Sequence, residues 1–152
     1  MRYSFFKHLF FITGLLICTS ILAQKSQKEK EGFYYSEKAQ RTEKTRDSIF
    51  YYLEKSRKIA IKHHLDTLLL KVTQTSVHQY FRFKKYTTSY TYCLQLDSLA
   101  KKQFDSVALY YAAHTLGRIE SRFDNSHKST EHYKKALAIA LKRNDSLSII
   151  YT

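Results

Sequence analysis

The stretch ALYYAAHTLGRIESRFDNSHKSTEHYKKALAIAL, residues 108–141, contains two apolar patterns separated by the polar pair Asp124-Asn125. The apolar positions are Ala108, Ala112, Leu116 and Ile119 in the first pattern, and Tyr133, Ala136, Leu137, Ala140 and Leu141 in the second. Steps of three and four residues place such positions on one face of an α-helix. Because the interval is short, the two predicted helices must run antiparallel and lie side by side.

The same pattern recurs along the chain with a period of about 40 residues. Ala60, Ala100 and Ala140 recur at this constant interval, within KSRKIAIKH, QLDSLAKKQ and KALAIALKR. The chain has no proline and only three glycines, so the tight turns of a β-sandwich are hard to build. We therefore expect an all-α fold in which antiparallel helix pairs stack as a short solenoid.

The expected helices follow from this periodicity. They span residues 48–64, 66–83, 87–102, 105–123 and 126–143, and a further helix begins at Asp145. Asp66, Asp105 and Asp145 recur where helices are expected to begin, and a carboxylate there can accept the free N–H groups of the first turn. The β-branched residues of TTSYTYCLQL, residues 87–96, favour a strand instead. We expect a helix because Ala100 lies on the repeat register.

Residues 108–141 resemble a tetratricopeptide repeat. The matching residues are Leu116 and Gly117 in the first helix, and Ser129, Tyr133 and Ala136 in the second. Small residues at a helix crossing let two backbones approach closely, and Tyr133 fills the space between them. The resemblance implies stacked helix pairs with a concave binding face.

The neighbouring units follow this family pattern less closely. His78 is aligned with the glycine and Leu96 with the final alanine, whereas Ser89 keeps the small position of the second helix and Ser56 occupies a small position in an earlier half unit. The period near 40 is longer than the usual 34 of the family. The approximate units are residues 47–64 (a half repeat), 65–103, 104–144 and 145–152 (incomplete).

The N-terminus has the three-part layout of a secretory signal peptide. Arg2 and Lys7 precede an uncharged apolar run, Leu9–Leu22, and Ala23 is followed by polar residues. The run is shorter than the roughly 20 residues that span a bilayer. We expect a signal peptide over 1–23, a polar linker over 24–46 and a helical domain over 47–152, placing the protein in the periplasm or cell envelope. An uncleaved anchor helix is the alternative.

The sequence offers no recognisable catalytic chemistry. It lacks glycine-rich phosphate loops, HExxH and CxxC motifs. His114 and His132 lie on different expected helices without a third ligand, and the mature chain keeps Cys93 alone. We expect no enzyme activity, no metal, no cofactor and no small-molecule substrate.

The family resemblance implies a groove lined by the first helix of each pair. Carried over by position, the groove-facing residues are Thr75, Gln79, Arg82, Tyr111, His114, Arg118 and Arg122. The arginines can bind carboxylates through paired hydrogen bonds, so an acidic protein or peptide is the expected partner. Plain exposed surface is an equal reading of these arginines.

Two functional hypotheses follow. Exported chains of this kind resemble the sensory N-terminal regions of bacterial regulators that continue into a histidine kinase or helix-turn-helix domain. The chain is then part of a longer regulator, or a small protein whose open end docks on another chain. The formal charge of +13 instead favours a nucleic-acid or polyanion binder, although export separates the chain from genomic DNA. Membrane contact is expected only through a retained N-terminal segment or a further region of the chain.

Overall fold

The computed structural model describes residues 22–41 and 45–152, and all regular structure in these ranges is α-helical. After a helix over 22–40, the chain forms α2 (Arg46–Lys62), α3 (Asp66–Arg82), α4 (Tyr86–Lys102), α5 (Ser106–Arg122), α6 (Ser126–Lys142) and α7 (Ser146–Ile150). These bounds lie within two residues of the expected ones, and the segment 87–96 is helical. No helix in the described ranges is long and apolar enough to cross a membrane. The expected signal peptide falls almost entirely outside these ranges.

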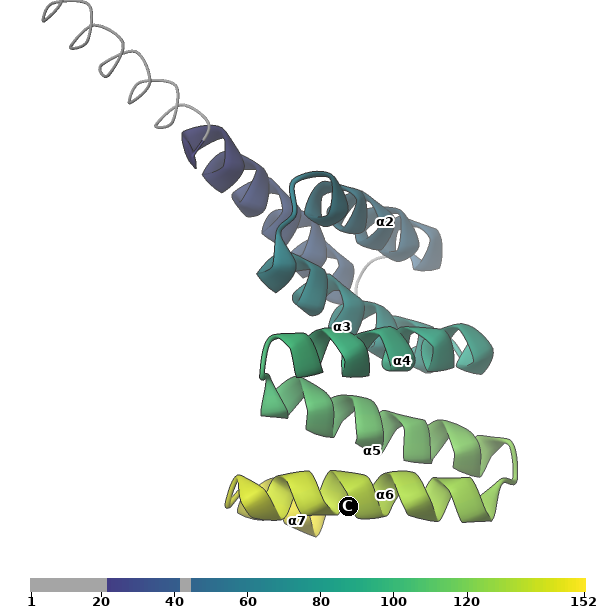
Figure 1. Cartoon of the computed structure of the whole chain (residues 1–152). Helices are drawn as coiled ribbons and strands as arrows, with labels where there is room; N and C mark the ends of the chain where they lie inside the picture. Colours follow the sequence, from purple (N-terminus) through teal and green to yellow (C-terminus); the bar gives the residue numbers. More distant parts are fainter. Residues whose placement is uncertain (1–21, 42–44) are drawn as a thin grey trace, which may run out of the picture.

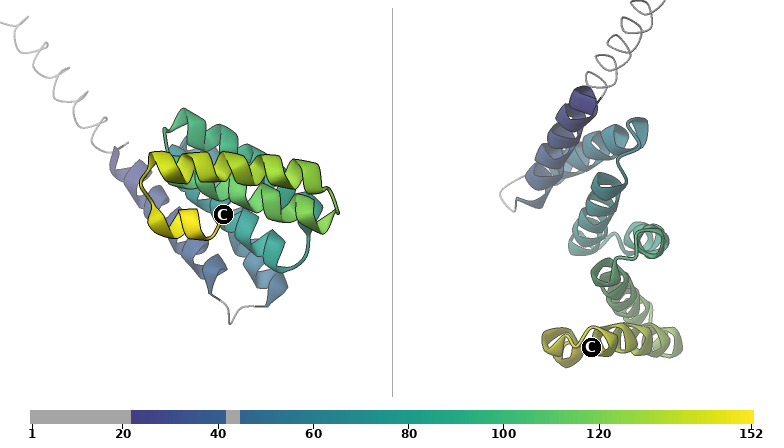
Figure 2. Two further views of the ribbon diagram at one scale, coloured as in Figure 1. Left: turned by 90° about the horizontal axis from the view of Figure 1, so that it is seen from below. Right: turned by 60° about the vertical axis from the view of Figure 1, so that its left-hand side comes forward.

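Each helix packs against the next one in the chain, so the molecule is a curved stack of antiparallel helices (Figures 1 and 2). Contacts also join α3 to α5, the first helices of two successive pairs. The connections α2–α3, α4–α5 and α6–α7 lie on one side of the stack, and α3–α4 and α5–α6 lie on the other (Figure 1). The expected all-α, repeat-like architecture is confirmed.

The connections between helices are the most regular feature of the fold. Helices α2 to α6 each contain 17 residues, and each connection contains three. The middle residue of each connection has a positive φ, and these residues recur at equal intervals of half a period. They are His64, Lys84, Phe104, Asp124 and Asn144, with φ between 51° and 58°. None is glycine, although left-handed backbone favours glycine.

Two hydrogen bonds close each connection. After α4, the Asp105 N–H donates to the Ala100 carbonyl at 2.9 Å, and the Phe104 N–H donates to the Lys101 carbonyl at 3.3 Å. This is the Schellman pattern, which satisfies carbonyl groups that a helix end leaves free. The same two bonds end α2, α3, α5 and α6. The chain therefore reverses direction at regular intervals with the same backbone geometry.

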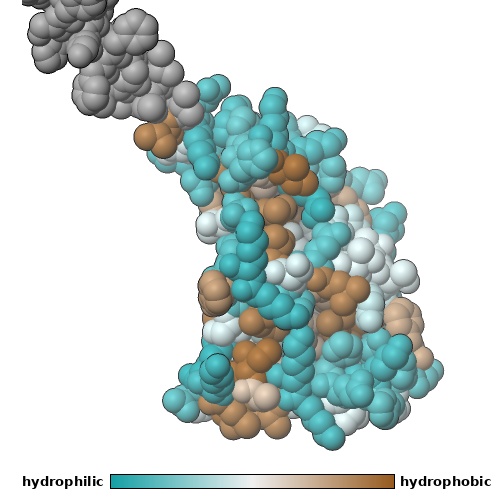
Figure 3. All heavy atoms as spheres, viewed as in Figure 1, coloured by the Kyte–Doolittle hydropathy of each residue, from teal (hydrophilic) through white to brown (hydrophobic). Residues whose placement is uncertain are grey.

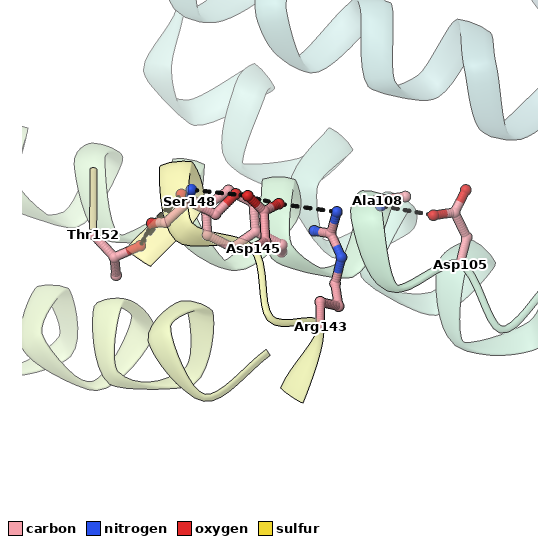
Figure 4. Close-up of polar contacts among 7 residues, drawn as sticks. Asp105, Ala108, Arg143, Asp145, Ser148 and Thr152 are labelled. Atoms are coloured by element: carbon pink, nitrogen blue, oxygen red, sulfur yellow. Dashed lines mark hydrogen bonds and ion pairs between the residues drawn. The ribbon is translucent and has the colours of Figure 1, made fainter. Parts of the chain in front are cut away.

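The carboxylate caps are confirmed at two of three positions. Asp105 accepts a hydrogen bond from the Ala108 N–H at 2.9 Å, and Asp145 accepts one from the Ser148 N–H at 3.1 Å (Figure 4). The expected cap at Asp66 is wrong, because Leu65 precedes α3 and has no side-chain cap bond. Asp66 lies one position further along the repeat register than Asp105 and Asp145.

The alanines that define the period lie in the core. Ala60, Ala100 and Ala140 are at most 1% exposed. Their carbonyls accept the Schellman bond that spans five residues, so each alanine lies directly beneath a connection. A larger side chain there would hold the next helix away from the previous one.

The residues that carry the resemblance to a tetratricopeptide repeat lie where α5 and α6 cross closely. The Ser129 hydroxyl donates to the Gly117 carbonyl at 2.9 Å, and a Cβ atom added to Gly117 would lie 3.0 Å from the Tyr133 ring. Leu116 and Ala136 are buried beside this crossing. The glycine therefore leaves room for the tyrosine.

The preceding helix pair, α3 and α4, crosses in the same way but with different residues at the contact. The Ser89 hydroxyl donates to the Val77 carbonyl, again at 2.9 Å. Val77 and Cys93 share one buried cluster, and they stand one full period before Gly117 and Tyr133. The alignment of His78 with the glycine is therefore wrong by one position. At this crossing Val77 and the small thiol of Cys93 take the places that Gly117 and the large ring of Tyr133 have in the next pair.

The segment 24–46, expected to be a polar linker, is helical over the described residues 24–40. Its buried residues are Gly32, Ser36 and Ala39. The Ser56 hydroxyl donates to the Gly32 carbonyl at 2.9 Å, and Tyr35 stacks on Tyr52. This helix packs on α2 and supplies the first member of an additional pair.

Replacing Phe104 by glycine should raise the free energy of unfolding by about 1 kcal/mol, because glycine adopts left-handed backbone without a clash at Cβ. As a control, Ser98→Gly within α4 should lower it by about 0.5 kcal/mol. Urea denaturation followed by circular dichroism measures both. A loss of stability in Phe104→Gly similar to that in the control would contradict the assigned geometry.

The two crossings predict a compensating pair of substitutions. Gly117→Val should lower the free energy of unfolding by about 2 kcal/mol through overpacking against Tyr133. Tyr133→Cys alone should cost about 3 kcal/mol through the cavity it leaves.

The double variant reproduces the Val77–Cys93 arrangement, so its cost should be smaller than the sum of the single costs by about 1–3 kcal/mol. Urea denaturation of the four proteins measures this coupling. Additive costs would show that the side chains at positions 117 and 133 do not compete for the same space.

Candidate binding groove

The first helices of two successive pairs border a hollow of about 300 Å³. Its lining residues are Gln40 from the N-terminal helix, Lys71, Gln74, Thr75 and His78 from α3, and Tyr111 from α5. The Gln40 amide donates to the Thr75 hydroxyl at 3.1 Å, which fixes one wall of the hollow. Among the residues that the structure describes, the lining is rich in hydrogen-bond donors and contains no carboxylate.

A second hollow, of about 210 Å³, lies further along α5. It is lined by Arg118, Ser121, Arg122 and Tyr133. The Arg118 guanidinium lies 4.3 Å from the centre of the Phe81 ring, which holds this side chain between α3 and α5. We refer to the two hollows together as the groove.

Four of the seven expected groove residues line it. Thr75 and Tyr111 lie in the first hollow, and Arg118 and Arg122 lie in the second. Arg82 is exposed and lies over the Phe83 ring at 5.1 Å, outside both hollows.

Gln79 does not face the groove. Its side chain is 0% exposed, and its amide donates to the Ala39 carbonyl at 2.9 Å. The constant repeat register instead aligns Gln74 with His114 and His78 with Arg118. For Gln79 the prediction used an offset from Arg118 that is one residue shorter than this register, and one residue corresponds to a rotation of about 100° around a helix.

The groove residues that the sequence prediction missed are Gln40, Lys71, Gln74 and His78 in the first hollow, and Ser121 and Tyr133 in the second. Lys71, Gln74 and His78 stand one full period before Tyr111, His114 and Arg118. The spacing of the alanines already contained this register. Gln40 carried no such signal, because the N-terminal helix was not expected.

The electrostatics of the first hollow favour neutral imidazole and neutral phenol. Partial burial lowers the pKa of His78, and the nearby charges of Arg82 and Arg118 lower this pKa further. Burial raises the pKa of Tyr111 to about 12. Lys71, Arg118 and Arg122 supply the formal charge of the groove, so it suits an anionic ligand.

His114 holds the last helix in place instead of lining the groove. Its Nε2 lies 3.0 Å from the Tyr151 carbonyl oxygen, and its ring stacks on Tyr110. The Tyr110 hydroxyl donates to the Ser148 carbonyl at 3.2 Å. Residues 146–152 are therefore tied to α5 by the side chains of Tyr110 and His114.

The described residues contain no cluster of three or more His, Cys, Asp or Glu side chains that could hold a metal ion. Cys93 is fully buried, and burial raises the pKa of its thiol to about 12. A thiol in this state is a poor nucleophile, because the thiolate is the reactive form.

Comparisons with known proteins give no further assignment. No protein-family model, no curated protein and no solved structure matches the chain.

Acidification should lower the free energy of unfolding through His114. Burial is the largest cause that lowers the pKa of His114 below 6.5; the hydrogen bond to the Tyr151 carbonyl acts in the opposite direction, and the charge of Arg118 lowers this pKa further. The unfolded chain then binds more protons as the pH falls, so the stabilisation is present above about pH 6.5 and is lost as the pH falls through the folded-state pKa.

An NMR titration should therefore give a His114 pKa below 6.5. His114→Gln should flatten the pH dependence of the free energy of unfolding, and glutamine already stands at the equivalent position, 74. A measured His114 pKa at or above its ordinary value would contradict this.

Proposed function

We propose that the chain is a non-catalytic, tetratricopeptide-like scaffold that binds an acidic segment of a partner protein in the groove. Support for the family likeness comes from the close crossing of Gly117 with Tyr133 and from the serine bond to the Gly117 carbonyl. A second support is the recurrence of that bond at Ser89 and Val77. Gly117 and Ser129 are the small residues of this crossing that carry the resemblance in the sequence.

The observation that carries the proposal is the composition of the groove. Lys71, Arg118 and Arg122 line it, and none of the carboxylates in ranges 22–41 and 45–152 does. A guanidinium binds a carboxylate through two parallel hydrogen bonds, and lysine adds a point charge. Because the hollows follow one another along α5 and are open to solvent, an extended acidic segment suits them better than a small enclosed ligand.

The cellular setting is part of the same proposal. The N-terminal sequence supports export to the periplasm or cell envelope. A repeat scaffold there would act as the sensory part of a signalling or transcriptional regulator. Determining the genomic reading frame beyond Thr152 tests this directly.

A fluorescently labelled oligoglutamate peptide is a suitable probe of the groove. Its binding, measured by fluorescence anisotropy, should weaken about tenfold or more in Arg118→Glu, because the substitution reverses a charge at the centre of the groove. The matched control is Lys58→Glu, which makes the same charge change on exposed α2, outside the groove.

Equal losses of affinity in the two variants would indicate attraction by net charge alone. Absence of peptide binding at low ionic strength would contradict the proposal. Circular dichroism of each variant checks that the helices are retained.

The alternative function is polyanion binding along the side of the α3–α4 and α5–α6 connections. The basic residues there are Arg41, Arg46, Arg82, Lys84, Lys85, Arg122 and Lys128, beside the carboxylates Asp47 and Asp124. Binding of DNA or RNA there should weaken steeply as salt increases. An electrophoretic titration at low salt tests it, and no association would exclude it.

A further inference from the structure

The opposite side of the stack carries a row of exposed apolar side chains. Phe104, Val107, Leu141 and Leu147 flank the α4–α5 and α6–α7 connections, and we call them the apolar edge. They share one side because both connections lie there (Figure 1), and positions 107 and 147 are one full period apart. Hydrophobic atoms reach the surface along this side, between hydrophilic ones (Figure 3).

Phe104 is the most exposed member of the apolar edge. It is 93% exposed, whereas Val107, Leu141 and Leu147 are 52%, 54% and 69% exposed. Its ring makes no aromatic or cation–π pair within the described ranges, whereas Phe83 and Phe123 on the opposite side each pack on another ring. Phe104 therefore contributes almost nothing to the core.

The backbone at residue 104 would itself favour another residue. Its φ is 55°, a region where asparagine, aspartate and histidine are enriched and bulky residues are outliers. His64, Asp124 and Asn144 follow this preference at equivalent positions. Phe104 does not, so packing and backbone geometry both leave its presence unexplained by the fold.

Basic residues surround the apolar edge. Lys101, Lys102, Lys142 and Arg143 end α4 and α6. The carboxylates at these helix ends are Asp66, Asp105 and Asp145, of which Asp66 pairs with Lys102 at 3.4 Å and Asp145 pairs with Arg143 at 3.0 Å. Lys101 pairs with Asp97 of its own helix. Lys142 makes no ion pair with any described residue, so cations remain in excess.

We propose that the apolar edge docks on an anionic lipid surface, with the Phe104 ring entering the interface and the lysines contacting lipid headgroups. Protruding apolar tips next to cations are the features that bind a peripheral protein to an anionic bilayer. A folded partner would need a complementary pocket for each separate tip, whereas a fluid bilayer accommodates them. Phe104, Val107, Leu141 and Leu147 also line none of the hollows described above.

The chain contains no tryptophan, so one introduced tryptophan reports on its own surroundings. The full chain is prepared as Phe104→Trp and, as the matched control, as Phe123→Trp on the opposite side. This position-specific signal is needed because the apolar run over 9–22 can itself bring the chain to a vesicle. The probes are vesicles of phosphatidylcholine alone and of phosphatidylcholine with phosphatidylglycerol.

With phosphatidylglycerol present, Trp fluorescence of the Phe104 variant should shift to shorter wavelength and be quenched by lipids spin-labelled near the headgroup. The Phe123 variant should show neither effect. Adding Lys142→Gln to the Phe104 variant should weaken the vesicle dependence of its signal about fivefold.

Three results would overturn the proposal. The first is an unchanged Phe104 signal with anionic vesicles, and the second is an equal or larger shift in the Phe123 variant, which would place the basic opposite side on the membrane. The third is a shift of the Phe104 signal with protein concentration in the absence of lipid, which would assign the apolar edge to a second copy of the chain.

Discussion

The left-handed residue between successive helices is the constraint on which the rest of the structure depends. It ends each of the helices α2 to α6 after 17 residues and sends the chain back antiparallel after three more. Five such residues stand at equal intervals, so the arrangement of one helix pair is repeated in the next. The alanine carbonyls beneath three of these connections accept the closing hydrogen bonds, which couples the buried small residues to the turns above them.

A fixed helix length has a direct consequence for surfaces. Residues that are one full period apart occupy the same place in successive pairs, so a groove or an edge is built one period at a time. Lys71 and Tyr111 enter one hollow for this reason, and Val107 and Leu147 share the apolar edge. The two sides of the stack differ because the connections on each side carry different residues.

Most of the helical architecture could be predicted from the sequence, because alanines and apolar residues at steps of three and four mark helices well. The helix over 22–40 could not, since its buried residues Gly32, Ser36 and Ala39 are small and form no apolar stripe. The positive-φ connections were also hidden, because His64, Lys84 and Phe104 are not the glycines that such backbone usually contains. The groove residues could be predicted only where α3 and α5 were aligned with the correct repeat offset. An offset of one position placed Gln79 at the surface when it lies in the core, whereas Tyr111 and Arg118, in the well-matched repeat, do line the hollows.

NMR measurement of the backbone φ angles from residue 60 to residue 146 tests the central claim most directly. Scalar couplings and chemical shifts should give positive φ at positions 64, 84, 104, 124 and 144, with uninterrupted helical values throughout α3, α4, α5 and α6. Negative φ at these positions, a helix continuing through any of them, or extended values within 86–102 would contradict the account.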